Sequence, residues 1–315
     1  MNRIIAWLAG MLMLAGLIAP ATAQTRTFNG FVIDEPLVPA HEILPGGPPR
    51  DGIPALTDPR MTTADEADWL EAGDRVIGYL HNDDARAYPI RLLNYHEIVN
   101  DRVGGEPVLI TFCPLCGTGM GFRPVLNGKP VEFGVSGLLY NSDLLMYDKA
   151  TKSLWSQVEG RAINGPLKGQ KLERVFVTHT TWGAWRDAYP DTRVLALETG
   201  YWRDYTRSPY GSYAESETLY FPVSNRDRRY HPKDVVLGLE WQGQALAFPL
   251  RELARTGEDR FTHTWQGQVF EVIHDDQART AEVRLPDGTR PDQMLAFWFA
   301  WTAFHPHTEV FAAPR

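Results

Sequence analysis

The sequence predicts a β-rich α+β fold, built from two internally duplicated halves that each combine sheet and helix. Short apolar runs rich in β-branched residues recur along the 315 residues, and Gly, Asn and Asp clusters separate them. Helical periodicity is confined to a few short stretches, and several blocks of sequence occur twice in the same order. We therefore expect helices packed on sheets, with the second half shortened.

The repeated blocks define the two halves. Residues 74–79 and 85–91 match residues 234–239 and 245–251 without a gap, at one offset of 160. Residues 182–185 and 190–194 match 298–301 and 306–310 at an offset of 116, so the second copy is shorter by 44 residues (160 minus 116). Matches in a constant order favour internal duplication over chance.

The elements expected in the first copy follow from these patterns. Strands at 75–81 and 84–90 form a hairpin, a short helix covers 91–100, and a buried strand at 107–113 follows. We expect further strands at 119–126, 130–136, 143–148 and 153–159, and a helix at 180–188 that ends before Pro190. The second copy repeats the hairpin with a turn at Gln242-Gly243 and closes with a helix at 293–304.

Five segments divide the chain. Residues 1–23 have a basic start at Arg3, an apolar run and a small-residue cleavage pattern before Gln24, which is typical of a signal peptide. Residues 24–60 hold seven prolines and are interpreted as an extended arm. Copy one then spans 61–200, an aromatic linker 201–232, and a degenerate copy two 233–315.

The signal peptide predicts a periplasmic or secreted protein with no membrane span after cleavage. Cleavage removes one positive charge and no negative charge, so the net charge falls from −8 to −9. That balance argues against nucleic acid as a partner. The expected partner is an unidentified periplasmic protein or a small molecule, and no nucleotide cofactor is expected.

The only two cysteines of the chain lie three residues apart, in Cys113-Pro114-Leu115-Cys116-Gly117. A buried strand that delivers two thiols on a Pro/Gly turn is typical of a metal-binding knuckle, because Gly117 can adopt a positive φ. Tetrahedral thiolate sites need four ligands, so other residue types must complete the set.

His96 is the first candidate for a further ligand, because it precedes the cysteine strand and has no counterpart in copy two. Met120 offers a thioether suited to copper, whereas Glu97 or Asp101 would suit zinc better. With a one-residue slip in the repeat, Cys113 falls opposite His274 and Cys116 opposite Gln277. We therefore expect the two thiols to have a functional role, because the repeated scaffold can form without them.

Three functions remain open for this site. The first is a copper or zinc site formed by His96, Cys113 and Cys116, with Met120 as a possible fourth ligand. The second is a periplasmic thiol–disulfide oxidoreductase that uses the same cysteines, although glycines after Cys116 disfavour the helix found in thioredoxin-type sites. The third is a non-catalytic binding module with a structural disulfide, whose loop is too short to stabilise the chain by more than about 2 kcal/mol.

Several blocks together resemble the bacterial domain-of-unknown-function family 3179, which carries a Cys-Pro-x-Cys-Gly motif. They are residues 87–89, 94–101, 113–117, 134–143 and 154–157. The resemblance covers about residues 55–313 and implies that this region is one family-wide module. It implies no particular activity.

Overall fold

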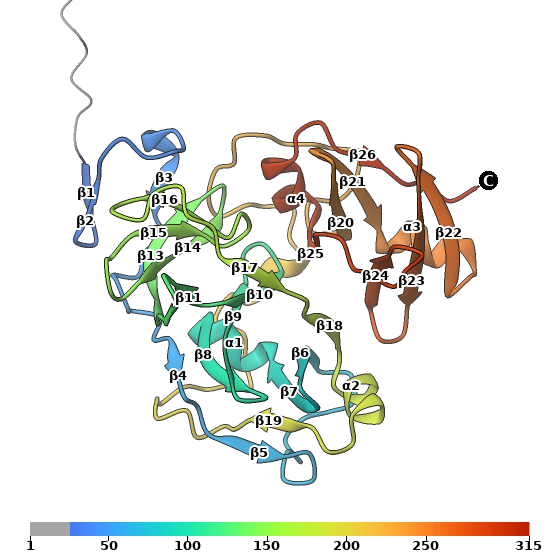
Figure 1. Cartoon of the computed structure of the whole chain (residues 1–315), viewed down its shortest axis with the longest axis horizontal. Coiled ribbons are helices and arrows are strands. Elements are labelled where there is room, and N and C mark those ends of the chain that lie inside the picture. Colours follow the sequence, from blue (N-terminus) through green and yellow to red (C-terminus); the bar gives the residue numbers. More distant parts are fainter. Residues whose placement is uncertain (1–25, 315) are drawn as a thin grey trace, which may run out of the picture.

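The computed structural model describes residues 26–314, so the expected signal peptide lies outside the described residues. Strands account for 42% and helices for 12% of the structure, which confirms the β-rich prediction. Five larger sheets are arranged in a propeller-like ring (Figure 1), an arrangement that the sequence patterns did not predict.

Three of these sheets are built from the first two thirds of the chain. The first contains, in spatial order, β17 (Glu173–Val175), β10 (Thr118–Arg123), β9 (Glu106–Cys113), β8 (Ile98–Val103) and β4 (Leu56–Thr57). The second contains β16 (Arg161–Asn164), β15 (Leu154–Ser156), β14 (Asp143–Asp148), β13 (Phe133–Tyr140) and β3 (Ile43–Pro45). The third contains β18 (Thr178–Thr181), β6 (Arg75–His81), β7 (Asp84–Pro89), β19 (Arg193–Leu195) and β5 (Met61–Thr63).

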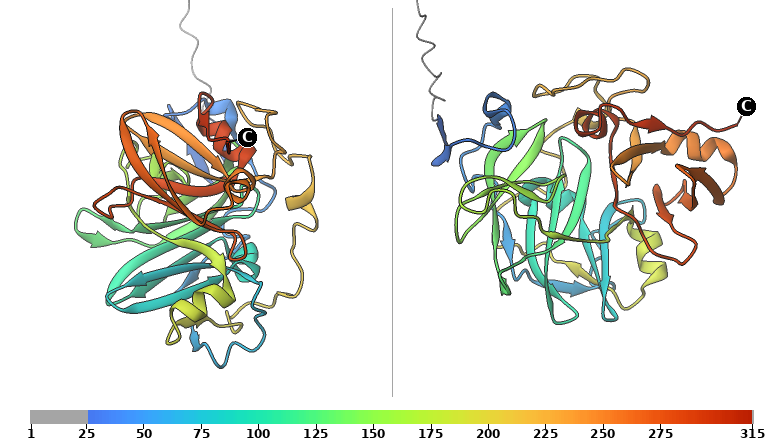
Figure 2. Two further views of the ribbon diagram at one scale, coloured as in Figure 1. Left: turned by 90° about the vertical axis from the view of Figure 1, so that its right-hand side faces the viewer. Right: turned by 45° about the horizontal axis from the view of Figure 1, so that its top comes forward.

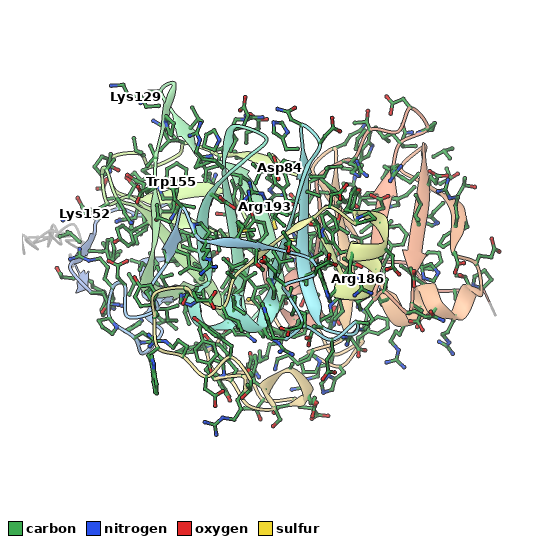
Figure 3. The ribbon with its side chains drawn as sticks, turned by 90° about the horizontal axis from the view of Figure 1, so that it is seen from below. Asp84, Lys129, Lys152, Trp155, Arg186 and Arg193 are labelled. Atoms are coloured by element: carbon green, nitrogen blue, oxygen red, sulfur yellow. The ribbon has the colours of Figure 1, made fainter. Side chains whose placement is uncertain are left out.

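The last third of the chain forms the other two sheets. The fourth contains β25 (Gln293–Phe297), β20 (Val235–Trp241), β21 (Gln244–Pro249) and β26 (Glu309–Val310). The fifth contains β22 (Arg260–Trp265), β23 (Gln268–Asp275) and β24 (Thr280–Arg284). Two small hairpins stand apart: β1 (Arg26–Phe28) with β2 (Phe31–Ile33), and β11 (Val125–Leu126) with β12 (Lys129–Pro130), whose projecting tip carries Lys129 (Figure 3).

Each of the four short helices that the structure describes follows directly on a strand. They are α1 (Ile90–His96), α2 (Trp182–Ala188), α3 (Leu250–Thr256) and α4 (Trp298–Phe304), with 3₁₀ turns at η1 (Ala40–Glu42) and η2 (Tyr213–Glu215). The predicted helix at 91–100 is wrong in its second part, because Glu97 turns the chain at φ 58° and β8 begins at Ile98. The predicted helix at 293–304 is likewise half strand, since β25 occupies its first five residues. No helix among residues 26–314 combines the length and the apolar character needed to cross a bilayer.

The hairpins of the third and fourth sheets share one register. Ile77 pairs with Tyr88 in β6–β7, and Leu237 pairs with Phe248 in β20–β21, so both partners are shifted by 160 residues. In the first and fifth sheets, the β8–β9 pair Ile98–Thr111 corresponds to the β22–β23 pair Arg260–Ile273 at a shift of 162.

The segment between the two regions, residues 198–232, is mostly irregular and runs along one side of the molecule from the third sheet to the fourth (Figure 2). The largest hydrophobic core joins the first, second and fourth sheets, and it contains both cysteines together with Trp155 and Trp301. Trp155 lies among the side chains of the second sheet (Figure 3). The candidate site is therefore inside the core, where several sheets meet.

Candidate metal centre

The cysteine turn joins β9 to β10, as the apolar run before it predicted. Cys113 is the last residue of β9 and pairs with Thr118, the first residue of β10. Cys116 N donates to Cys113 O at 3.2 Å, which closes the turn. Gly117 has φ 62°, and a Cβ at that position would come within 2.9 Å of the Phe297 ring. A side chain is thus excluded at Gly117 by both backbone conformation and space.

A second turn faces the cysteines. Asn141 and Ser142 link β13 to β14 with φ of 53° and 62°, the pair of positive values required by a tight type I′ hairpin turn. The carbonyl oxygen of Ser142 lies 3.4 Å from Cys116 Sγ and 3.7 Å from Cys113 Sγ, so it accepts weak hydrogen bonds from the thiols. Asp143 follows directly and begins β14.

These two turns bring Cys113, Cys116 and Asp143 together. One ligand atom from each lies within 4.8 Å of the others, and the three residues are at most 2% exposed. Both cysteines are free thiols, so the structural disulfide of the third alternative is not present in the described residues. Asp143 Oδ2 accepts a hydrogen bond from Val158 N at 3.1 Å, while Oδ1 is buried with no partner in the described part of the chain. A buried oxygen without a partner is costly unless something binds it.

Burial sets the protonation of this group when no cation is present. Loss of solvent raises the pKa of Cys113, raises that of Cys116 well above the usual value, and raises the pKa of Asp143 to about 7. A divalent cation would reverse this preference, because it binds the deprotonated forms and releases their protons.

A buried lysine lies close to the same group. Lys233 Nζ donates to Ser216 O and Thr218 O, both at 3.0 Å, and sits 3.6 Å from the centre of the Tyr213 ring. Burial lowers the pKa of Lys233 to about 8, and the nearby Cys116 acts in the opposite direction. The cationic form of Lys233 would therefore be favoured by negative charge on the sulfurs.

Glu97 borders the site from the end of α1. It is 6% exposed and has a strained φ of 58°, while its carbonyl accepts from Phe112 N at 2.8 Å. Tyr210, from the long irregular segment, donates its hydroxyl to Glu97 Oε1 at 3.0 Å. Burial raises the pKa of Glu97 to about 8.

The structure places His96 and Asp101 outside the three-residue group. His96 is buried with Nδ1 2.8 Å from Pro54 O and Nε2 2.6 Å from Tyr205 Oη, so both ring nitrogens are occupied. Burial lowers its pKa to about 4, and it is not part of the three-residue group. Met120 is buried in the hydrophobic core that also holds the cysteines. Asp101 accepts from Tyr88 Oη at 2.8 Å in a separate network.

Asp143 was missed because the Asn141-Ser142-Asp143 run indicates a turn as readily as a site. The signal that could have found it is its place in the family-like block 134–143, the longest block shared with that family.

The residues predicted to lie opposite the two cysteines in the second half of the chain also need correction. At the observed shift of 162, Cys113 corresponds to Asp275 and Cys116 to Ala278, not to His274 and Gln277.

Comparisons with known proteins give one match. Neither the curated proteins nor the solved structures contain a match to this chain. A family model described as a protein of unknown function, DUF3179, matches residues 50–287 and thus spans more than half of the chain, including the cysteine turn and Asp143. The chain belongs to the DUF3179 family.

Proposed function

We propose that this protein is an exported metal-binding protein in which Cys113, Cys116 and Asp143 hold one zinc ion. The observation that carries the proposal is the buried three-residue group itself, with ligand atoms within 4.8 Å of one another and Asp143 Oδ1 lacking any other described partner. Free, buried thiols beside a buried carboxylate form a donor set that suits a divalent cation.

The donor set favours zinc over copper. Zinc accepts sulfur and carboxylate oxygen together, whereas a hard carboxylate is a poor ligand for cuprous copper. Three protein ligands leave a fourth position of a tetrahedron open, as in catalytic zinc sites. Zinc with two thiolates and one carboxylate carries one net negative charge, which the nearby Lys233 offsets.

Burial argues against the thiol–disulfide alternative. Cys113 and Cys116 are 2% and 0% exposed, and a partner disulfide must reach a sulfur in order to exchange with it. Their raised pKa values also reduce the fraction of thiolate, which is the attacking form.

Two further parts of the proposal concern the whole chain. Residues 1–23 have the pattern of a cleaved signal peptide, which supports export to the periplasm or to the outside of the cell. Residues 233–315 are a shortened copy of 61–200, and the shared strand registers at shifts of 160 and 162 support that origin. On this view the second copy keeps the scaffold and has Asp275 and Ala278 in place of the thiols.

Metal content of the exported, mature protein tests the proposal. We expect one equivalent of zinc in the wild type, and a thiolate-to-metal charge-transfer band after replacement by cobalt. Cys116→Ser and Asp143→Asn should each weaken zinc binding at least tenfold, because each removes one ligand.

Asp101→Asn is the matched control, because Asp101 is also buried but lies outside the group. It should retain a full equivalent of zinc. Metal-free wild type with no cobalt–thiolate band would refute the zinc proposal. A reversible Cys113–Cys116 disulfide in that protein would support the oxidoreductase alternative instead.

A further inference from the structure

A cavity of about 220 Å³ lies against the candidate metal centre. Leu115, which stands between the two cysteines, forms part of its wall, as does Leu144, which follows Asp143. Glu97 and Tyr210 border the same space. The cavity is therefore bordered by the chain neighbours of Cys116 and Asp143, Leu115 and Leu144.

The wall of this cavity is almost entirely apolar. The side chains that surround it are mainly leucine, valine, isoleucine and aromatic, including Ile53, Val135 and Phe221. Neither lysine nor arginine contributes to the wall in the described part of the chain. An anionic ligand would meet no positive charge and would lie beside the carboxyl group of Glu97, so anions are disfavoured.

Polarity is confined to a small part of the wall. Glu97 Oε1 accepts the hydroxyl of Tyr210 at 3.0 Å, and both residues line the cavity. The position of Glu97 is fixed from both sides of its peptide unit: its N donates to Leu93 O at 2.8 Å, and its O accepts from Phe112 N at 2.8 Å. A fixed polar atom beside an apolar space is typical of a small-molecule site.

We propose that the cavity binds a small neutral alcohol, with its apolar body against Leu115 and Leu144 and its hydroxyl on the carboxyl group of Glu97. A hydroxyl can both donate and accept, so it suits this carboxyl group in either protonation state. The volume fits six to eight carbon atoms, since an apolar cavity of about 150 Å³ already accommodates benzene. The inference rests on the proposed function only in placing this ligand next to the zinc ion.

Calorimetric titration of the zinc-loaded full-length protein with benzyl alcohol tests the proposal, with hexanoate and hexylamine as charged comparisons. We expect saturable binding of benzyl alcohol and at least tenfold weaker binding of either charged compound. Ile53→Trp fills the cavity from a partly buried position and should weaken benzyl alcohol binding at least tenfold. Glu97→Leu should weaken it as well, through loss of the polar contact.

Val32→Trp is the matched control, because Val32 is 54% exposed on β2 and lies outside the cavity wall. It should leave binding unchanged. Absence of saturable benzyl alcohol binding, equal binding of hexanoate, or unchanged affinity in Ile53→Trp would each overturn the inference. Zinc content measured on the same samples separates the two ideas: zinc without alcohol binding refutes the cavity ligand alone, and alcohol binding without zinc refutes the metal centre alone.

Discussion

Replacing Gly238 with alanine should destabilise the protein more than the same replacement at Gly78. These glycines occupy matching positions in β20 and β6, and each lies under a tryptophan. A Cβ on Gly238 would come within 2.2 Å of the Trp301 ring, and a Cβ on Gly78 within 2.2 Å of the Trp185 ring. The difference must therefore come from how far each ring can move.

The cost can be estimated from the contacts of each ring. Relief of the clash needs a displacement of about 1.2 Å, the gap between 2.2 Å and an ordinary contact of 3.4 Å. Trp301 is fully buried and donates Nε1 to Thr308 Oγ1 at 2.9 Å, and its ring centre lies 3.9 Å from that of His305, with the two rings tilted by 32°. Overpacking costs about 1–3 kcal/mol and a strained hydrogen bond about 1 kcal/mol more, which gives about 2–4 kcal/mol for Gly238→Ala.

Trp185 has more freedom. It donates to Thr192 Oγ1 at 2.9 Å in the same way, but it borders cavities of about 400 and 320 Å³ into which the ring can shift. We therefore expect about 1–2 kcal/mol for Gly78→Ala.

Urea unfolding followed by far-ultraviolet circular dichroism measures both changes, since tryptophan fluorescence would respond to the ring itself. Gly73→Ala is the control, because a Cβ there meets nothing within 4 Å, and it should change stability by less than about 0.5 kcal/mol. Trp301→Leu should cost less in the Gly238→Ala background than in the wild type, as expected for residues in contact. A cost for Gly78→Ala that equals or exceeds that of Gly238→Ala would refute the reasoning.

Three other outcomes follow from buried polar groups. Burial, helped by Arg75, lowers the pKa of His179 from 6.5 to about 4, so on acidification the unfolded chain takes up this proton before the folded protein does. The contribution of His179 to the free energy of unfolding should therefore be full above about pH 6.5, fall by about 3 kcal/mol towards pH 4 and then level off. Urea midpoints measured across this pH range should lack that part of the fall in His179→Asn. Lys233→Met should weaken zinc binding roughly 10- to 100-fold in competition with a chelating dye, whereas an unchanged affinity would contradict the electrostatic role. The Asn100 side chain accepts from Phe133 N at 2.8 Å and donates to Phe133 O at 2.9 Å, so Asn100→Ala should cost about 2–4 kcal/mol in urea unfolding, and a loss below about 1 kcal/mol would count against it.

Local patterns predicted the parts of the fold that depend on neighbours in sequence. The strand before Cys113 and the hairpin of β6 and β7 are confirmed, because continuous apolar runs bounded by turn residues specify them directly. The end of α1 was misjudged because Glu97 adopts a positive φ that its residue type does not signal. The ring of sheets was beyond reach, because it depends on side-chain contacts between sheets such as that of Asn100 with Phe133.

The candidate site was likewise predicted only in part from the sequence. The cysteines were identified by their spacing, and the structure brings them together as free thiols. Asp143 lies 27 residues beyond Cys116 on another sheet, so only the fold reveals that it joins them. His96 looked available because sequence cannot show that Pro54 and Tyr205 already occupy its two nitrogens.

The hydrogen bond from Phe297 N to Cys116 O, at 2.8 Å, connects the cysteine turn to β25, which lies beyond the family match that ends at residue 287. A chain shortened at that boundary would lose this support for the turn. It would also lose the neighbour that covers one edge of β20, leaving a row of unpaired backbone groups beside apolar side chains. Such an edge promotes aggregation, so the family boundary is a poor place to end a fragment meant for biochemical work.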